Sequence, residues 1–305
     1  MNTREQKALF DDRGYLIVDV LTAGELEECQ REIRCLHERA ADLEAAGDPA
    51  FGNFQREPYA GDAAESGLPV LRKIENTRAL SEVFRRLSAH PGLVATAQNL
   101  IGSDLLLFRS TLMLKPALHG SAHGLHQDSA YWPMDPPTLV TVSIALNDAT
   151  PENGCIQVIP GSHKWAQMEH RDTLDKNNLL TRGQELAVDV NEDEAVYMPL
   201  NPGEISLHHV MMAHASTPNT TDDRRIGFAV RYIRPEVSQI NADKDCAWLV
   251  RGEDTHGNFI HEKPVEVDMD AAAVAEYTRI MKLRQGILYK GVQGKPAHVE
   301  LEQAG

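Results

Sequence analysis

The stretch Leu125-His126-Gln127-Asp128 lies in predicted extended chain and precedes two aromatic residues, Tyr131 and Trp132. Side chains of an extended strand alternate with a period of two, so His126 and Asp128 point to the same side. Two ligands on one rigid strand can bind the same metal ion. Two histidines and one carboxylate form the open metal site of non-haem Fe(II) oxygenases. The stretch therefore requires a fold that brings a second histidine beside it.

The overall composition is that of a globular protein with an acidic surface. The chain has 305 residues, and its 42% hydrophobic and 25% charged content suits a sizeable core. Its 30 basic and 45 acidic residues give a net charge of −15, which disfavours binding to nucleic acid or to an anionic membrane. Nothing in the sequence predicts an oligomeric state.

The cysteines and the apolar segments indicate the cellular compartment. The four cysteines show no CxxC spacing, so we expect reduced thiols rather than disulfides or a zinc site. The N-terminus is polar, and no apolar run approaches the roughly 18 residues of a membrane helix. These features predict a cytoplasmic protein.

The first hundred residues are predicted to be mainly helical. A short helix over residues 3–13 leads into a strand at Gly14–Val18, and Thr22-Ala23-Gly24-Glu25 is a capping box that starts an amphipathic helix ending near Gly47. Residues 78–101 are predicted to form two helices. Residues 48–70 have no period and are predicted to form a long loop, which often serves as a lid.

The middle of the chain is predicted to be a β-core. Strands are predicted at residues 105–114, 140–146, 156–159, 186–190, 205–209 and 226–233. Short strands separated by Gly/Pro turns, without helices between them, favour a sandwich or barrel. We therefore predict one domain over residues 1–305. Its parts are a mainly helical region (1–101), a core carrying the metal site (102–235) and a C-terminal extension with a helix (236–305).

Several other histidines could complete or mimic the metal site. His170-Arg171-Asp172 repeats the His-x-Asp pattern, but its polar, aperiodic surroundings predict a solvated loop. His208 and His209 lie on a predicted strand and face opposite sides, so one of them faces the interior. His214 follows at the start of a turn-rich segment. The histidines that flank the first pattern, His119 and His123, are expected at the surface or behind the ligands.

An arginine completes the chemistry that the histidines suggest. Arg224 and Arg225 begin a predicted strand about ten residues after His214. A guanidinium binds a carboxylate through two parallel hydrogen bonds, which is what an oxygenase using 2-oxoglutarate requires. A hairpin could return one of these arginines to the metal.

At this point the chain resembles the phytanoyl-CoA dioxygenase family of Fe(II)/2-oxoglutarate oxygenases. The resemblance covers most of residues 5–233 and is specific as a combination of segments. The segments that carry it are His126-Gln127-Asp128, Asn147-Asp148-Ala149-Thr150-Pro151-Glu152-Asn153-Gly154-Cys155, Ile159-Pro160-Gly161-Ser162-His163, His214-Ala215-Ser216 and Arg225. The family implies a mainly β fold with flanking α-helices, namely a double-stranded β-helix (a cupin-like jelly roll) with N-terminal helices packed on its core.

The resemblance also implies roles for individual residues. His126, Asp128 and His214 would be the iron ligands. Arg225, assisted by Ser216, would bind the C5 carboxylate of 2-oxoglutarate. Further cosubstrate contacts are implied at Lys73 and Thr111, whereas Ser143 stands near a position where some relatives carry a bulky aromatic residue.

The reaction implied is oxidation of an unactivated C–H bond of a small molecule by Fe(II), 2-oxoglutarate and O2, with release of succinate and CO2. Related halogenases replace the metal-binding carboxylate with a small residue so that chloride can bind. Asp128 therefore argues against halogenation. Hydroxylation is the default outcome, and desaturation, cyclisation and oxidative demethylation are the alternatives.

The substrate-contacting residues are the least constrained by sequence. Tyr131 and Trp132 are candidates for a pocket wall, and Phe54, Arg56 and Trp248 for a lid, although packing or solvation explains each of them equally well. Tyr59 belongs to the same loop as the first two lid candidates. A net charge of −15 makes a phosphate-bearing acyl-CoA less attractive as a substrate.

Two other classes of protein compete with an oxygenase. A non-catalytic jelly roll could hold a metal or ligand, but a missing ligand or arginine would then be expected. A hydrolase or isomerase with a cupin-like site usually has three or four histidine ligands, and no His-x-His occurs near position 126.

Overall fold

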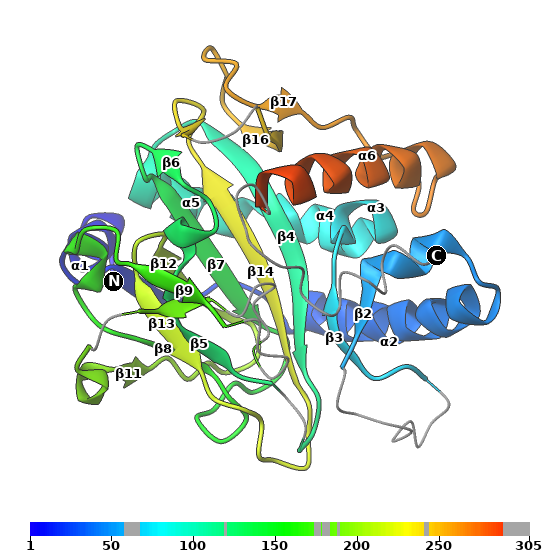
Figure 1. Cartoon of the computed structure of the whole chain (residues 1–305), viewed down its shortest axis with the longest axis horizontal. Coiled ribbons are helices and arrows are strands. Elements are labelled where there is room, and N and C mark those ends of the chain that lie inside the picture. The colour runs from blue at the N-terminus through cyan, green and yellow to red at the C-terminus, as the bar shows by residue number, and fades with distance from the viewer. Residues whose placement is uncertain are drawn as a thin grey trace.

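The computed structural model describes residues 1–57, 68–118, 121–173, 178, 184–187, 190–240 and 244–288. Two sheets of mainly antiparallel strands form its core, and helices cover one of them (Figure 1). The strands of the large sheet, in spatial order, are β1 (Tyr15–Asp19), β12 (Glu204–His209), β7 (Leu139–Ala145), β14 (Arg225–Ile233), β4 (Leu105–Lys115), β16 (Cys246–Arg251) and β17 (Ile260–His261), with β3 (Leu71–Ile74) pairing β4 and β2 (Phe54–Arg56) pairing β3.

The small sheet lies across the cavity from the large one. Its order is β11 (Val196–Tyr197), β8 (Ile156–Val158), β13 (Ala213–Ser216) and β5 (His123–Gln127). Two further pairs of short strands join β9 (His170–Asp172) to β10 (Gln184–Leu186), and β6 (Met134–Asp135) to β15 (Ser238–Gln239). Antiparallel sheets with N-terminal helices packed outside them are the architecture expected of a double-stranded β-helix.

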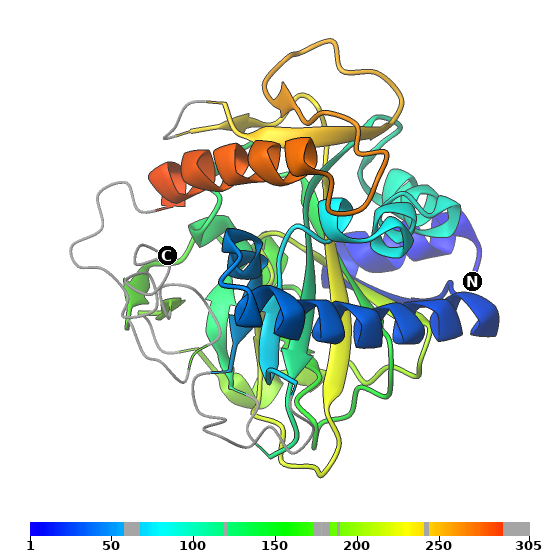
Figure 2. The same ribbon diagram turned by 90° about the vertical axis from the view of Figure 1, so that its right-hand side faces the viewer.

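Helices cover the outer face of the large sheet, as Figure 2 shows for the long helix α2. The helices are α1 (Thr3–Arg13), α2 (Ala23–Ala45), α3 (Thr77–Leu80), α4 (Glu82–Ser88), α5 (Pro91–Ile101) and α6 (Ala271–Leu288), with short 3-10 turns η1 (Pro49–Asn53), η2 (Asp128–Ala130), η3 (Ser162–Lys164) and η4 (Glu192–Glu194). In the described part of the chain, no helix combines the length and the hydrophobicity that a membrane crossing needs.

The helix α2 follows its sequence signals closely. The Thr22 hydroxyl accepts a hydrogen bond from the Glu25 backbone N–H, and the Glu25 carboxylate accepts one from the Thr22 backbone N–H, so the predicted capping box is present. Cys29, Ile33 and Leu36 point into the main hydrophobic core. Burying this apolar face against the sheet stabilises the helix more than its intrinsic propensity does.

Strand β14 shows how the alternation of side chains divides the molecule into two layers. Phe228, Val230 and Tyr232 point outward into the core under the helices, where the Tyr232 hydroxyl donates to the Ser88 carbonyl at 2.8 Å. The alternate residues of the same strand face the cavity between the sheets, from Arg225 at one end to Arg231 at the other. The inner face of the large sheet therefore forms one wall of that cavity.

Two predicted loops contain regular structure. Residues 48–70 were expected to be a loop throughout, but this region contains η1 and β2, and β2 pairs with β3 at the edge of the large sheet. The segment around His170 was expected to be a solvated loop, but it forms β9. Neither segment shows a hydrophobic period in its sequence. Each is held in place by pairing to a neighbouring strand.

Candidate active site

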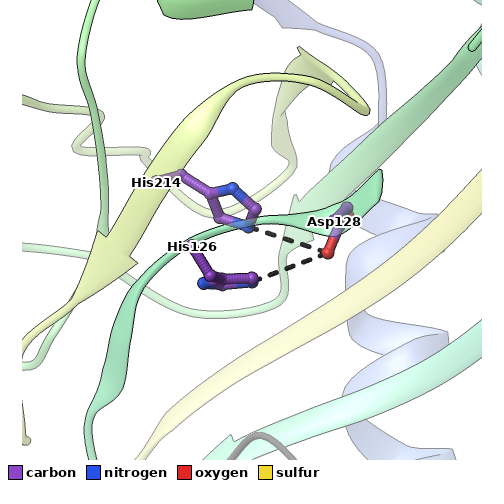
Figure 3. Close-up of side chains that lie close together, drawn as sticks. All are labelled: His126, Asp128 and His214. Carbon is purple, nitrogen blue, oxygen red and sulfur yellow. Dashed lines mark ion pairs between the residues drawn. The ribbon is translucent and has the colours of Figure 1, made fainter. Parts of the chain in front are cut away.

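Three ligand-type side chains converge on the wall formed by the small sheet (Figure 3). His126 on β5 and His214 on β13 are directly paired across the two strands, and Asp128 begins η2. One Asp128 carboxylate oxygen lies 3.6 Å from Nε2 of His126 and 4.0 Å from Nε2 of His214. The three ligand atoms lie within 4.8 Å of one another, and all three residues are buried. They form a ready site for one metal ion.

Hydrogen bonds behind the ligands fix their orientation. Nδ1 of His126 lies 2.7 Å from the Gly124 carbonyl, and Nδ1 of His214 lies 3.0 Å from the Met212 carbonyl. A carbonyl only accepts, so each Nδ1 donates its proton there, and Nε2, which faces Asp128, is the nitrogen placed to bind a metal. The other oxygen of Asp128 accepts a hydrogen bond from the Thr141 hydroxyl at 3.0 Å.

The protonation states also suit a metal. Burial, followed by the neighbouring His126 and His208, holds the pKa of His214 well below its usual range. Burial acts to raise the pKa of the Asp128 carboxyl, but the surrounding imidazoles outweigh it and leave this pKa well below its usual range. Neutral imidazole and ionised carboxylate are the forms that bind metal ions, so the donor set fits Fe(II).

Of the two adjacent histidines on β12, His208 is the one that faces the cavity. Its Nε2 lies 3.9 Å from the second Asp128 oxygen, and its ring centroid lies 4.4 Å from that of His214. Neither ring nitrogen of this buried side chain has a hydrogen-bond partner. His209 faces the opposite way, toward His163. Since only His214 has its Nδ1 anchored by a carbonyl, we assign the second ligand position to His214.

Two buried cations lie at one end of the large-sheet wall. Arg225 on β14 pairs in register with Lys115 on β4. The Lys115 ammonium donates to the Ser216 hydroxyl at 2.8 Å and to the Thr217 carbonyl, whereas Arg225 donates to the Gly154 carbonyl and its Nε has no partner. Burial lowers the pKa of Arg225 to about 10, and burial with the neighbouring Arg225 holds the pKa of Lys115 well below its usual range.

These two cations require an anion. Within the described residues, neither Lys115 nor Arg225 forms an ion pair with a carboxylate. A buried positive charge without a counter-charge is expensive, and a bound anion removes that penalty. Lys115 was missed by sequence reasoning, because only the strand register places it opposite Arg225.

Small residues separate the cations from the far end of the wall. Gly227 and Ala229 on β14 lie opposite Ala145 and Ser143 on β7, and all four line the cavity. Short side chains here leave room beside the metal-ligand wall for a small organic molecule. Ser143 belongs to this open floor, so no bulky ring fills the space at that position.

The remaining predicted cosubstrate residues form a separate polar group. Lys73 on β3 is ion-paired to Glu75, and the Thr111 hydroxyl donates to the same carboxylate at 3.2 Å. Both line the cavity. Lys73 is thus already ion-paired, whereas Lys115 is in no ion pair among the described residues and interacts with Glu57 at longer range. This difference favours Lys115 over Lys73 as the cation that assists Arg225.

Two of the predicted substrate residues line the cavity and three do not. Tyr131 and Trp132 are lining residues, and the Tyr131 ring meets the His126 ring edge-on at 6.1 Å. Phe54, Arg56 and Trp248 are not among the described residues that line the cavity, and their role as a lid stays a prediction.

The contacts of these three side chains explain why none of them lines the cavity. Phe54 is buried in the core and stacks on Phe51, which leaves its neighbour Gln55 to face the cavity. Arg56 is exposed and paired with Glu44. Trp248 packs on the core beneath the Arg78 guanidinium. Tyr59 and His119 lie outside the described residues.

The second His-x-Asp segment, which begins at His170, makes a hydrogen bond to the strand that carries the first. The His170 Nε2 accepts a hydrogen bond from the Gln127 backbone N–H at 3.0 Å, and its Nδ1 donates to the Met168 carbonyl at 2.9 Å. Gln127 lies between the two ligands of the first copy, so His170 braces the ligand-bearing strand. Only Arg171 and Asp172 of this copy are solvent-exposed as expected.

Comparisons with known proteins agree with this geometry. The sequence model of the family described as phytanoyl-CoA dioxygenase matches residues 10–227. A protein of Stutzerimonas stutzeri, named a probable alpha-ketoglutarate-dependent hypophosphite dioxygenase, is 26% identical over 271 residues, which are 86% of this chain and 91% of that protein.

Solved structures are similar over most of the chain. The non-heme monooxygenase ThoJ in its apo form has a TM-score of 0.75 and 31% identity, covering 93% of this chain and 98% of its own. The epimerase SnoN, in complex with Fe3+, alpha ketoglutarate and nogalamycin RO, has a TM-score of 0.59 and 25% identity, covering 78% of this chain and 85% of its own.

Proposed function

The chain belongs to the phytanoyl-CoA dioxygenase family, and from this premise we propose that it hydroxylates an unactivated C–H bond of a small molecule, using Fe(II), 2-oxoglutarate and O2. One observation carries the proposal. A two-histidine, one-carboxylate donor set lines the same cavity as Arg225, which has no carboxylate partner among the described residues and lies next to Lys115 in the strand register. The first is a site for iron, and the second is a site for the far carboxylate of a diacid cosubstrate.

Each residue would have a separable role. His126, Asp128 and His214 would hold Fe(II) through two neutral nitrogens and one carboxylate oxygen. Arg225 would bind the C5 carboxylate of 2-oxoglutarate, with Lys115 and Ser216 beside it. Bound there, iron with 2-oxoglutarate and O2 supplies an oxidant able to remove hydrogen from an aliphatic carbon. The protein orients the ligands and keeps the small-residue floor open for the cosubstrate.

The carboxylate of Asp128 limits which reaction the metal site would perform. It is buried, ionised and hydrogen-bonded to Thr141, so it would occupy the metal position that a halide needs. Oxygen transfer to carbon is therefore favoured over halogenation. The buried free thiols and the ferrous ion both suit a reducing compartment, and we place the activity in the cytoplasm.

The proposal is tested by titrating the metal-free protein with Fe(II) and then with 2-oxoglutarate under anaerobic conditions. We expect a weak visible charge-transfer band once both are present. Admission of air should then release succinate from 2-oxoglutarate.

The controls separate an enzyme from a binding protein. His214→Ala should give neither the band nor succinate, whereas His256→Ala, at an exposed histidine, should behave as wild type. A wild-type protein that binds Fe(II) and 2-oxoglutarate without releasing succinate would be a non-catalytic binding protein. If it binds neither ligand, the oxygenase assignment is wrong.

A further inference from the structure

Another arginine, Arg231, faces the cavity at the end opposite Arg225. Arg231 on β14 is paired in register with Thr141 on β7, whose hydroxyl donates to Asp128. His208 is paired with Thr141 from the other side, and Arg109 on β4 is paired with Arg231. Arg231 thus belongs to a polar row across four strands, level with the metal-ligand carboxylate.

Arg231 differs from the other cations around it in having no hydrogen-bond or ion-pair partner among the described residues, although Asp128 and Glu75 lie near enough to interact with its charge. The neighbouring cations that line the cavity each have a carboxylate partner: Lys73 with Glu75, Arg109 with Asp245 at 2.6 Å, and Arg284 with Glu262 at 2.9 Å. Arg231 forms no hydrogen bond or ion pair within the described residues, and its Nε is buried without a partner. Its guanidinium lies over the Trp132 ring, 5.2 Å from the centroid.

This arrangement orients the arginine for a ligand. A cation–π contact with an indole uses none of the guanidinium N–H groups as hydrogen-bond donors to a carboxylate, so they stay available to a ligand. These N–H groups match a carboxylate, which accepts two parallel hydrogen bonds. Because a partly buried cation without an acceptor destabilises the ligand-free protein, binding of an anion here is favoured.

The cosubstrate cannot be this anion while it is bound at Arg225. A five-carbon diacid has two carboxylates. With one bound at Arg225 and the other at the metal, neither would be left for Arg231. The second arginine therefore serves a different molecule.

The surroundings of Arg231 suggest the body of that molecule. Helix α6 runs beside the large sheet (Figure 2), and its Met281 and Ile287 line the same cavity as Trp132. These three side chains add apolar surface to a chamber in which the charged residues Arg109, Asp245 and Arg284 are paired with one another or with Glu262. Arg231 and α6 both lie beyond residues 10–227, the part that the family model matches.

Building on the proposed function, we propose that the substrate is a carboxylic acid with an apolar body, whose carboxylate binds Arg231 in the chamber beneath α6. The reacting carbon then lies on the side of His126 and Asp128. Arg231 is thus a substrate-positioning residue that sets which carbon reaches the metal.

The test uses the full-length protein loaded with Ni(II) and saturating 2-oxoglutarate, so that the Arg225 site is filled. Three probes of similar shape are compared by calorimetry and saturation-transfer NMR: 3-phenylpropanoate, 3-phenylpropanamide and 2-phenylethyl phosphate. We expect the carboxylate to bind about 10- to 100-fold more tightly than the amide. Arg231→Gln should abolish this preference, and Arg251→Gln, at an exposed arginine on β16, should preserve it.

The outcomes separate this inference from the proposed function. Equal binding of acid and amide, no binding of the acid, tighter binding of the phosphate, or an unchanged preference in Arg231→Gln would each overturn it. Binding of 2-oxoglutarate is measured in the same samples. Its absence in wild type would count against the proposed function, whereas its presence without carboxylate preference would count against the role of Arg231 alone.

Discussion

The two walls of the cavity carry different chemistry. The small sheet and η2 present two imidazoles and one carboxylate, each held by a hydrogen bond from behind. The inner face of the large sheet presents cations at both ends, Arg225 with Lys115 and then Arg231, separated by residues as small as Gly227. The first wall has the character of a metal site and the second that of an anion site.

This contrast predicts that the two functions fail separately. Metal binding should depend on the small sheet, and binding of organic ligands on the large sheet. A variant of one wall should leave the other function intact, because the groups belong to different strands with different supporting contacts. The variants below test this division, from the largest expected effect to the smallest.

Removing a ligand from the small sheet should cause the largest change. In His214→Ala, we expect Fe(II) affinity to fall by more than about 100-fold, because loss of a supporting group alone typically costs 10- to 100-fold. Anaerobic titration of Fe(II) measures this loss. His256→Ala, at an exposed histidine, is the matched control. Near-normal metal affinity in His214→Ala would move the ligand role to His208.

Arg225→Gln should weaken binding of 2-oxoglutarate at the large-sheet wall and leave metal binding unchanged. We expect 2-oxoglutarate binding to weaken by about 30-fold or more, since truncating one partner of a buried charge pair costs about 2–5 kcal/mol. Calorimetry on the metal-loaded protein measures this. Fe(II) affinity should stay at the wild-type value, and Arg224→Gln next to it should bind 2-oxoglutarate normally. Loss of metal binding in Arg225→Gln would contradict the division between the walls.

Lys115→Met should have a smaller effect on 2-oxoglutarate, about tenfold, because Arg225 retains the bidentate contact. The same change should alter how stability depends on pH. In the folded protein, burial and Arg225 hold the pKa of Lys115 well below 10.5. Between that lowered pKa and 10.5 the unfolded chain binds more protons, so this residue makes the folded state more stable as pH rises.

Chemical denaturation of the ligand-free protein across this pH range checks the second effect. The free energy of unfolding should rise less with pH in Lys115→Met than in wild type. Identical pH profiles for the two proteins would show that Lys115 does not cause the rise in the free energy of unfolding with pH. An exposed lysine, as in Lys7→Met, provides the control.

His170→Ala should have the smallest effect. The side chain contacts the ligand-bearing strand at the Gln127 backbone N–H rather than at a ligand. We therefore expect Fe(II) affinity to fall by less than about tenfold, with 2-oxoglutarate affinity measured at fixed bound metal unchanged. A loss as large as that in His214→Ala would mean that His170 does more than brace strand β5.

Sequence reasoning identified the residues whose environment is set by local alternation. The His126–Asp128 pair and the strands from Leu105 and Arg225 follow from side-chain periodicity, and the capping box of α2 follows from four consecutive residues. The assignment of His214 and Arg225 to one site needed the family resemblance as well, because alternation alone left His208 and Arg224 open.

The rest depended on pairing between distant segments. Lys115 faces Arg225 only because of the register of β4 and β14, and no local signal fixes a register. Phe54 lies in a segment without hydrophobic period. The sequence therefore could not predict that Phe54 packs in the hydrophobic core while Gln55 faces the cavity. His170 gained its partner from β5, a strand more than 40 residues away.

The position of α6 has a consequence for how this protein could evolve. The helix contributes Met281, Arg284 and Ile287 to the cavity but no candidate metal ligand, and it follows the family-wide segment that ends at residue 227. Substitutions in this helix can therefore alter which molecules are accepted while the iron and 2-oxoglutarate sites stay unchanged. This part of the cavity lining is encoded apart from the candidate metal ligands and Arg225, and selection can act on it without changing them.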